Sequence, residues 1–239
     1  MEKRKGISFD EDHTYERWKL GLLSIEKTYP EIKKITEPIP GSDLFIDLTE
    51  SLDGEVHYEP RKLTFTFDAM DCDYECWETL LSDIADELHG QNKKIVLDTD
   101  PCFYYIGRCV VSTNKSNPIT AEVVIEAEVE PYKYELYSSL EDWDWDSFDF
   151  ETGIIREYRE LTVDGSLTLT IEGRRKRVIP TFMVNSVDGS GLKVKFEGAT
   201  YDLPDGNVRV LNIVIRQGEN TLLFSGNGTV SVDYRGGRL

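Results

Sequence analysis

The sequence predicts a mainly β protein of two domains, with one helix in the first domain and a β-sandwich or jelly roll as the second. Three observations support this prediction: apolar and polar residues alternate over several segments, one segment has helical spacing, and turn-forming residues divide the second half. The 239 residues are 39% hydrophobic and 11% aromatic, which supplies apolar material for one large core or two of ordinary size.

The longest alternation runs over residues 119–130, where every second side chain is apolar and most of those between are acidic. Only Val124 interrupts the polar set. A period of two is typical of a strand with one buried face and one solvated face. Shorter segments at 63–67 and 167–171 repeat the pattern. We therefore expect strands to dominate the chain and the 119–130 strand to present an acidic face.

One segment instead has the spacing of an amphipathic helix. Its apolar residues are Trp77, Leu80, Leu81, Ile84 and Leu88. Asp73 is suitably placed for an N-cap, and Gly90 is placed to end the helix. The sequence thus predicts a helix over about 74–89, with its apolar stripe packed on a sheet rather than on a cofactor.

After Pro131, turn-forming residues separate a series of short segments of strand length. Residues that tolerate positive φ or preset a turn occur at Asp164-Gly165, Asp188-Gly189-Ser190-Gly191, Pro204-Asp205-Gly206-Asn207 and Gly226-Asn227-Gly228. Strands are predicted between them at 192–196, 208–215, 221–224 and 229–234. This succession indicates a β-sandwich or jelly roll. We place the domain boundary near Lys133, giving domains 1–133 and 134–239.

Charge limits the kinds of partner. The chain has 27 Lys and Arg against 45 Asp and Glu, a formal net charge of -18, so general attraction to nucleic acid phosphates is not expected. The basic start at residues 1–5 is not followed by the apolar region of a signal peptide, and no apolar stretch is long enough to span a bilayer. We expect a protein made and folded in the cytoplasm, without membrane insertion.

The four cysteines are few for this length and form no repeated CxxC pairs. They are Cys72, Cys76, Cys102 and Cys109. We expect reduced, partly buried thiols. The alternative is a metal site that uses Cys72 and Cys76, one helical turn apart, but none of the three histidines stands at a familiar ligand spacing. No metal or cofactor is therefore predicted.

Catalytic motifs are absent from the sequence. No GxSxG elbow, P-loop, GxGxxG or HExxH occurs, so an enzyme is not expected. The alternative is a hydrolase with paired carboxylates, because two such groups need only meet in space and leave no sequence spacing to find.

Two short stretches are the candidate contact sites. Residues 142–146 have alternating carboxylates like a calcium loop, but Ser147 replaces the turn glycine and Gly153 the bidentate Glu. Within this stretch, Trp143 and Trp145 either pack in a core or form an exposed platform for a sugar ring.

The second stretch is a basic run that interrupts the acidic background: Arg174, Arg175, Lys176 and Arg177. Such a run is a solvated turn, a charged strand edge that prevents unwanted pairing, or a contact for a neighbour's carboxylates.

The order of features resembles one known family over nearly the whole chain. The matching pieces are Phe9, His13-Thr14, Trp18-Lys19-Leu20, Tyr29-Pro30, Pro40-Gly41-Ser42-Asp43, residues 46–50, Tyr58, Arg61, residues 63–67, the 77–88 helix, Asp98-Thr99-Asp100-Pro101, residues 104–108 and Pro131-Tyr132-Lys133, then Val178-Ile179-Pro180, Gly218-Glu219-Asn220 and residues 226–230. In this order they resemble the distal tail protein of long, non-contractile-tailed phages, in its Gram-positive phage and prophage form.

The resemblance implies an N-terminal, β-sandwich-like, ring-forming domain with one helix, and a C-terminal galectin-like or carbohydrate-module-like sandwich. It implies a structural baseplate hub at the virion tail tip: a homo-hexameric ring that joins the tail tube protein to the tail-associated hub and receptor-binding proteins and lets DNA pass. The alternative is a carbohydrate-binding protein that recognises host glycans through the C-terminal sandwich.

Overall fold

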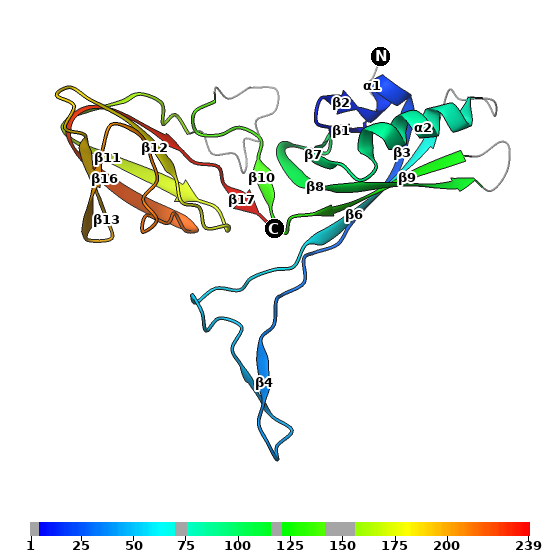
Figure 1. Cartoon of the computed structure of the whole chain (residues 1–239), viewed down its shortest axis with the longest axis horizontal. Coiled ribbons are helices and arrows are strands. Elements are labelled where there is room, and N and C mark those ends of the chain that lie inside the picture. Colours follow the sequence, from blue (N-terminus) through cyan, green and yellow to red (C-terminus); the bar gives the residue numbers. More distant parts are fainter. Residues whose placement is uncertain (1–4, 70–75, 116–120, 142–155) are drawn as a thin grey trace. The chain divides into compact units, whose positions relative to one another are not determined.

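The computed structural model describes residues 5–69, 76–115, 121–141 and 156–239. The chain forms two compact units (Figure 1). Unit 1 comprises residues 1–100, 104–133 and 239, and unit 2 comprises residues 101–103 and 134–238. Strands predominate in both, which confirms the mainly β prediction.

The elements fall into two groups along the chain. Those of the first group, which lie wholly or mainly in unit 1, are β1 (Ile7–Phe9), β2 (Asp12–His13), α1 (Thr14–Trp18), β3 (Leu20–Lys27), β4 (Thr36–Pro38), β5 (Phe45–Asp47), β6 (Arg61–Ala69), α2 (Trp77–Leu88), β7 (Asn92–Leu97), β8 (Asp100–Lys115) and β9 (Ala121–Val129). Those of the second are β10 (Lys133–Glu135), β11 (Leu161–Gly173), β12 (Thr181–Ser186), β13 (Leu192–Phe196), β14 (Ala199–Leu203), β15 (Gly206–Val208), β16 (Gly218–Asp233) and β17 (Gly237–Arg238).

Unit 1 is built on an antiparallel sheet with the strand order β2-β1-β7-β8-β9-β6-β3. The alternation predicted for β9 is confirmed: Val123 and Ile125 are buried, whereas Glu128, and Glu130 just after the strand, are exposed. Ile119, the predicted start of that strand, lies outside the described residues. One face of the sheet therefore forms the core, and the other face carries the acidic row.

The predicted helix is present as α2, which lies along the sheet of unit 1 (Figure 1). Its Trp77, Ile84 and Leu88 join the buried cluster of the sheet. Cys76 precedes the helix and makes no side-chain cap bond, and Asp73 lies outside the described residues. Gly90 follows with a φ of 73°, a value that suits a glycine just past a helix end. Among the described residues, no helix is both long and apolar enough to cross a membrane.

Two local predictions in unit 1 need correction. Cys76 is disulfide-bonded, whereas Cys102 and Cys109 are free thiols, so the expectation of reduced cysteines throughout is wrong. Disulfide formation depends on a Cβ separation of about 3.8 Å, which sequence spacing does not reveal. The short helix α1 was not predicted; it ends at Trp18 and is capped by Lys19, whose φ of 54° is left-handed.

Unit 2 has a six-stranded sheet with the order β14-β13-β16-β12-β15, and β11 also pairs with β16. The β11–β16 pairing runs from Leu161 opposite Val230 to Gly173 opposite Gly218. The core lies on the side where alternate side chains of these strands are buried, and it includes an edge-to-face pair between Phe182 and Phe224 with ring centres 6.0 Å apart. Long paired strands thus organise this unit.

Two predicted turns lie inside strands instead. Gly165 of β11 stands opposite Gly226 of β16, and both have positive φ, so the glycines let the paired strands bend without ending them. Gly228 has another role, because a Cβ there would lie 2.4 Å from the Asn185 carbonyl oxygen of β12. The two strands predicted at 221–224 and 229–234 are consequently one strand, β16.

The predicted strand at 208–215 is also wrong. β15 ends at Val208, and the residues that follow form no strand except for an isolated bridge between Val178 and Ile215. Ile213 and Ile215 are nevertheless fully buried. The apolar residues of this segment reach the core from an irregular backbone. A pattern of buried apolar residues in the sequence does not distinguish such a segment from a strand.

Candidate self-assembly surfaces

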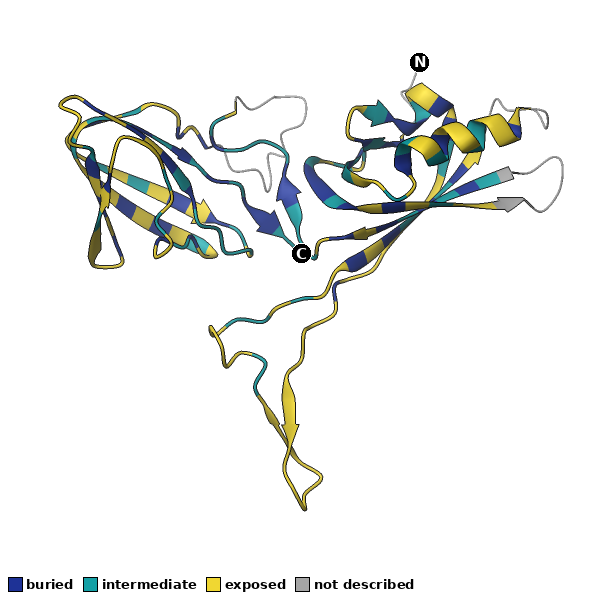
Figure 2. Ribbon diagram, in the orientation of Figure 1, coloured by how far each residue is buried: buried dark blue, intermediate teal, exposed yellow. Residues whose placement is uncertain are grey.

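The segment between β3 and β6, residues 28–60, forms a narrow two-stranded hairpin that we call the arm (Figure 1). Its strands β4 and β5 pair with each other as a separate sheet, with Thr36 opposite Asp47. Every residue from 31 to 47 is exposed (Figure 2). The arm therefore contributes almost nothing to the core of unit 1.

The arm is rich in exposed apolar side chains. Of the fourteen large apolar residues that are exposed in the described parts of the chain, eight lie on the arm. They are Tyr29, Ile32, Ile35, Ile39, Leu44, Phe45, Ile46 and Leu52. This concentration of exposed apolar side chains on one hairpin makes the arm a candidate interaction site.

Backbone hydrogen bonds give the arm a defined shape. The Lys33 N–H donates to the His57 carbonyl at 2.9 Å, and the Leu48 N–H donates to the Ile35 carbonyl at 2.8 Å. Near β5, the Thr49 N–H donates to the Asp47 carboxylate, and hydrogen bonds from Thr49 lower the pKa of that carboxyl. An isolated hairpin is only marginally stable in water, so we expect the arm to become more stable when another protein surface covers it.

Sheet edges provide a second type of surface. β2 and β3 end the strand path in unit 1, and β14 and β15 end it in unit 2. Leu23 on β3 is 57% exposed, and β3 contains an irregularity between Leu22 and Ser24. An edge strand leaves backbone N–H and C=O groups free to pair with another chain.

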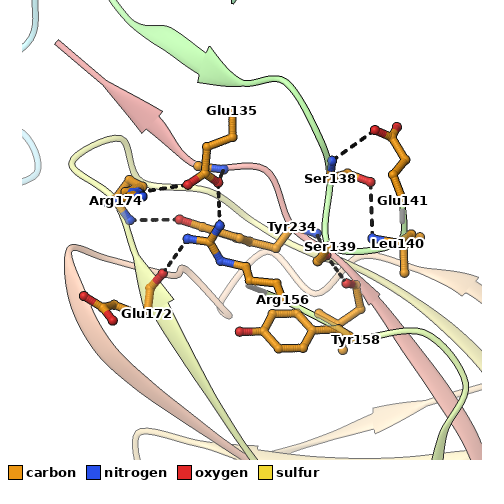
Figure 3. A network of polar contacts seen from close by, with 12 residues as sticks. Glu135, Ser138, Ser139, Leu140, Glu141, Arg156, Tyr158, Glu172, Arg174 and Tyr234 are labelled. Carbon is orange, nitrogen blue, oxygen red and sulfur yellow. Dashed lines mark hydrogen bonds and ion pairs between the residues drawn. The ribbon is translucent and has the colours of Figure 1, made fainter. Parts of the chain in front are cut away.

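The basic run lies just after β11, and its members differ in their surroundings. The Arg174 side chain donates from Nε to Glu135 at 2.9 Å, so it is held within unit 2 (Figure 3). Lys176 lies over the Tyr134 ring, 4.3 Å from its centre, and also bonds to the Tyr134 hydroxyl. Arg175 is exposed. A contact between the run and a neighbouring subunit stays a prediction, and Arg175 is its most accessible member.

Glu135 is the centre of a buried polar network (Figure 3). Its carboxylate accepts bonds from Arg156 at 2.7 Å, Arg174 at 2.9 Å and the Gly236 N–H at 2.9 Å. Arg156 in turn lies 4.9 Å from the centre of the Tyr234 ring. The network ties β10, the end of β11 and the C-terminal strand together.

The network does not resemble an acid–base catalyst. Burial raises the pKa of Glu135, but the charge of Arg156 and the hydrogen bonds from Arg174, Arg156 and Gly236 outweigh it, so the pKa is lowered. A carboxylate with a lowered pKa is ionised at neutral pH, so it cannot act there as a general acid, and the donors around it make it a weak base. No group of three or more His, Cys, Asp or Glu among the described residues could hold a metal ion.

The predicted sugar platform lies beyond what the structure describes, since Trp143 and Trp145 fall in residues 142–155. Unit 2 does have an open groove of about 650 Å³. It is lined by Thr162, Val163, Asp164, Asn185, Ser186, Val187, Asn227, Gly228 and Thr229, with no aromatic ring. Glycan binding therefore stays a prediction.

Sequence reasoning identified neither the arm nor the Glu135 network as a site. The arm contributed only short pieces to the family resemblance. The sequence feature that could have identified it is a series of apolar residues with no strand or helix period, placed between two segments with clear strand alternation. The ion network leaves no sequence signal, because Glu135 and Arg156 are distant in sequence and stand among many other charges.

Comparisons with known proteins support the fold. No family model matches the chain, and no curated protein sequence matches it. Eight chains of solved structures do match. One is the Dit protein of phage SPP1, described as a paradigm of the hub adsorption apparatus in phages that infect Gram-positive hosts. The TM-score is 0.67 at 10% identity, and the match covers 99% of this chain and 100% of that one. The predicted likeness is thus confirmed at the level of the fold.

Proposed function

We propose that the protein is a structural component of a phage tail tip, which assembles into a hexameric ring between the tail tube and the host-recognition apparatus. One observation carries the proposal: the fold is shared over the full length of both chains with a protein described as a phage adsorption hub. Because the match includes both units, a shared architecture explains it better than a chance similarity between single sandwich domains.

The arm supports a role in self-assembly. Its exposed apolar side chains stand on a hairpin shaped by backbone hydrogen bonds, and a neighbouring copy that covers them would also stabilise the hairpin. A head-to-tail contact, in which one surface meets a different surface of the next copy, closes into a ring when its rotation divides a full turn. The arm provides one half of such a contact.

The proposed partners follow from the tail-tip position. They are the tail tube protein, the tail-associated hub protein and the receptor-binding proteins of the baseplate, in a virion assembled from proteins made in the host cytoplasm. DNA passes through the ring without specific binding, because an acidic wall repels phosphates. The net charge of -18, the exposed Glu128 of β9 and the exposed Glu130 just after it support this part of the proposal.

The test is self-association of the purified chain over a wide concentration range, followed by sedimentation and negative-stain microscopy. We expect closed rings, and we expect the double variant Leu44→Ser and Phe45→Ser to stay monomeric, because it removes apolar area from the tip of the arm. Val187→Ser is the control, since Val187 is an apolar residue of unit 2 that is even more exposed, at 82% against 69% for Leu44 and 64% for Phe45. A chain that stays monomeric even with tube and baseplate proteins would contradict the proposal.

A further inference from the structure

A group of cations flanks the two ends of the arm within unit 1. Lys27 is the last residue of β3, Arg61 is the first residue of β6, and Lys133 stands at the start of β10. We call these three residues the base-of-arm cation cluster. Asp100, at the start of β8, forms an ion pair with Lys133.

Arg61 is the most unusual member, because it is only 6% exposed. Its Nε and Nη2 atoms are buried and have no hydrogen-bond partner within the part of the chain that the structure describes. The guanidinium lies 4.8 Å from the centre of the Tyr105 ring. Burial lowers the pKa of Arg61, and the groups that oppose this are tyrosines, Tyr105 and Tyr29, not a carboxylate.

Lys27 experiences the same excess of positive charge. Burial lowers the pKa of Lys27 most, and the charges of Lys133 and Arg61 lower it further. Asp100 is the acidic group that acts in the opposite direction, and it is already paired with Lys133. The charge of Asp100 therefore acts on Lys27 against those of two neighbouring cations, in a chain whose net charge is -18.

The other buried arginine named above shows what a completed pair looks like in this protein. Arg156 is 8% exposed and has Glu135 at 2.7 Å. Arg61 has comparable burial and an aromatic ring beneath its guanidinium, but no carboxylate of the described residues is paired with it. Burial of a charge without its partner is costly, so a carboxylate brought by another molecule would stabilise Arg61.

We propose that the base-of-arm cation cluster is a carboxylate-binding site, completed by an Asp or Glu side chain from a second copy of the chain. This inference rests on the proposed self-assembly. The guanidinium fork of arginine matches a carboxylate with two parallel hydrogen bonds. The chain supplies 45 acidic residues, and Tyr29, which lies beside Arg61 at the start of the arm, is 83% exposed and can move aside.

The test compares Arg61→Met with wild type in two measurements. Methionine keeps a flexible apolar side chain against the Tyr105 ring and removes the charge. We expect the monomer's melting temperature to stay equal or to rise, because no internal ion pair is lost. We expect the dissociation constant for self-association to rise by at least about tenfold, as for the loss of a charged hydrogen-bonded contact. Arg61→Lys, which keeps the charge without the planar fork, should weaken association less.

Lys62→Met is the matched control. Lys62 is the next residue of β6, its side chain is 55% exposed, and it is paired with Glu126 at 2.7 Å. It should associate like wild type. Equal association of the Arg61→Met variant, or a melting temperature well below that of wild type, would overturn this proposal while the proposed function stands. A wild-type chain that never assembles would instead overturn the proposed function, and the second-copy carboxylate with it.

Discussion

Glu135 shows how a single buried carboxylate orders one unit. Its three hydrogen-bond donors come from Arg156, Arg174 and the Gly236 backbone, which lie far apart in sequence. Removing the carboxylate would take a buried acceptor from each of these three donors at once. The lowered pKa of Glu135 means that the folded state favours the ionised form more strongly than the unfolded chain does.

The pH dependence follows from that direction. A depressed folded pKa contributes stability above the unfolded value for Glu, about 4.3, and that contribution is lost as pH falls through the folded pKa. We expect Glu135→Gln to destabilise unit 2 by about 3–5 kcal/mol at pH 7, the range for breaking a buried ion pair. The difference from wild type should shrink towards acidic pH.

Hydrogen exchange at the Gly236 amide measures this effect directly, because that N–H donates to the Glu135 carboxylate. Glu172→Gln is the control, since Glu172 joins the network only through its backbone carbonyl, which accepts from Arg156 at 2.9 Å. Equal protection of Gly236 in wild type and in Glu135→Gln at neutral pH would show that the carboxylate does not hold this strand.

Glycines mark the limit of sequence reasoning at the residue scale. The sequence predicts a turn wherever a residue tolerates positive φ, and Asp188 to Gly191 does form one, with the Asp188 carboxylate bonded to the Ser190 N–H. Gly165 and Gly226 have the same chemistry but lie within paired strands. The difference is set by the partner strand, which the local sequence does not contain.

The arm is the element whose stability depends most on its surroundings. Lys33 and Lys34 lie on it and are exposed, and Lys33 is held by its backbone bond to His57 and by an ion pair with Glu59 at 3.8 Å. Local opening exposes a backbone to proteases, and it requires little free energy in a lone hairpin. We expect trypsin to cut after Lys33 or Lys34 early in the dilute monomer and slowly in the assembled form.

Lys195 is the internal comparison for this experiment, followed by mass spectrometry of the fragments. It is exposed like Lys33, but it lies in β13 between β14 and β16. Its cleavage should be slow in both states. Unchanged cleavage at the arm after assembly would argue that the arm is not part of the contact.

Elements with a clear period could be predicted, and the others could not. β9 and α2 were predictable because one face of each is buried, so the sequence repeats with the strand or helix period. The arm has no buried face, and its apolar residues follow neither period. The segment around Ile213 failed for the opposite reason, since buried residues without regular hydrogen bonding imitate a strand.

At the scale of the whole molecule, the net charge of -18 opposes association of identical copies. Exposed like charges are screened by salt, whereas buried ion pairs and apolar contacts are screened much less. We expect self-association to strengthen as NaCl rises from about 0.05 M to about 0.5 M, where the Debye length falls to a few ångströms. Sedimentation velocity measures this, and weaker association at high salt would indicate an interface dominated by exposed ion pairs.

The arm is inserted into the sheet of unit 1 between two strands that pair with each other. The arm leaves the sheet after Lys27 and returns at Arg61, and the strands on either side pair directly, with Lys27 opposite Leu63. A short turn could bridge that point without disturbing the sheet. The hairpin is thus an exchangeable insertion: its length and chemistry can be rewritten for a new neighbour while the core that folds the chain stays intact.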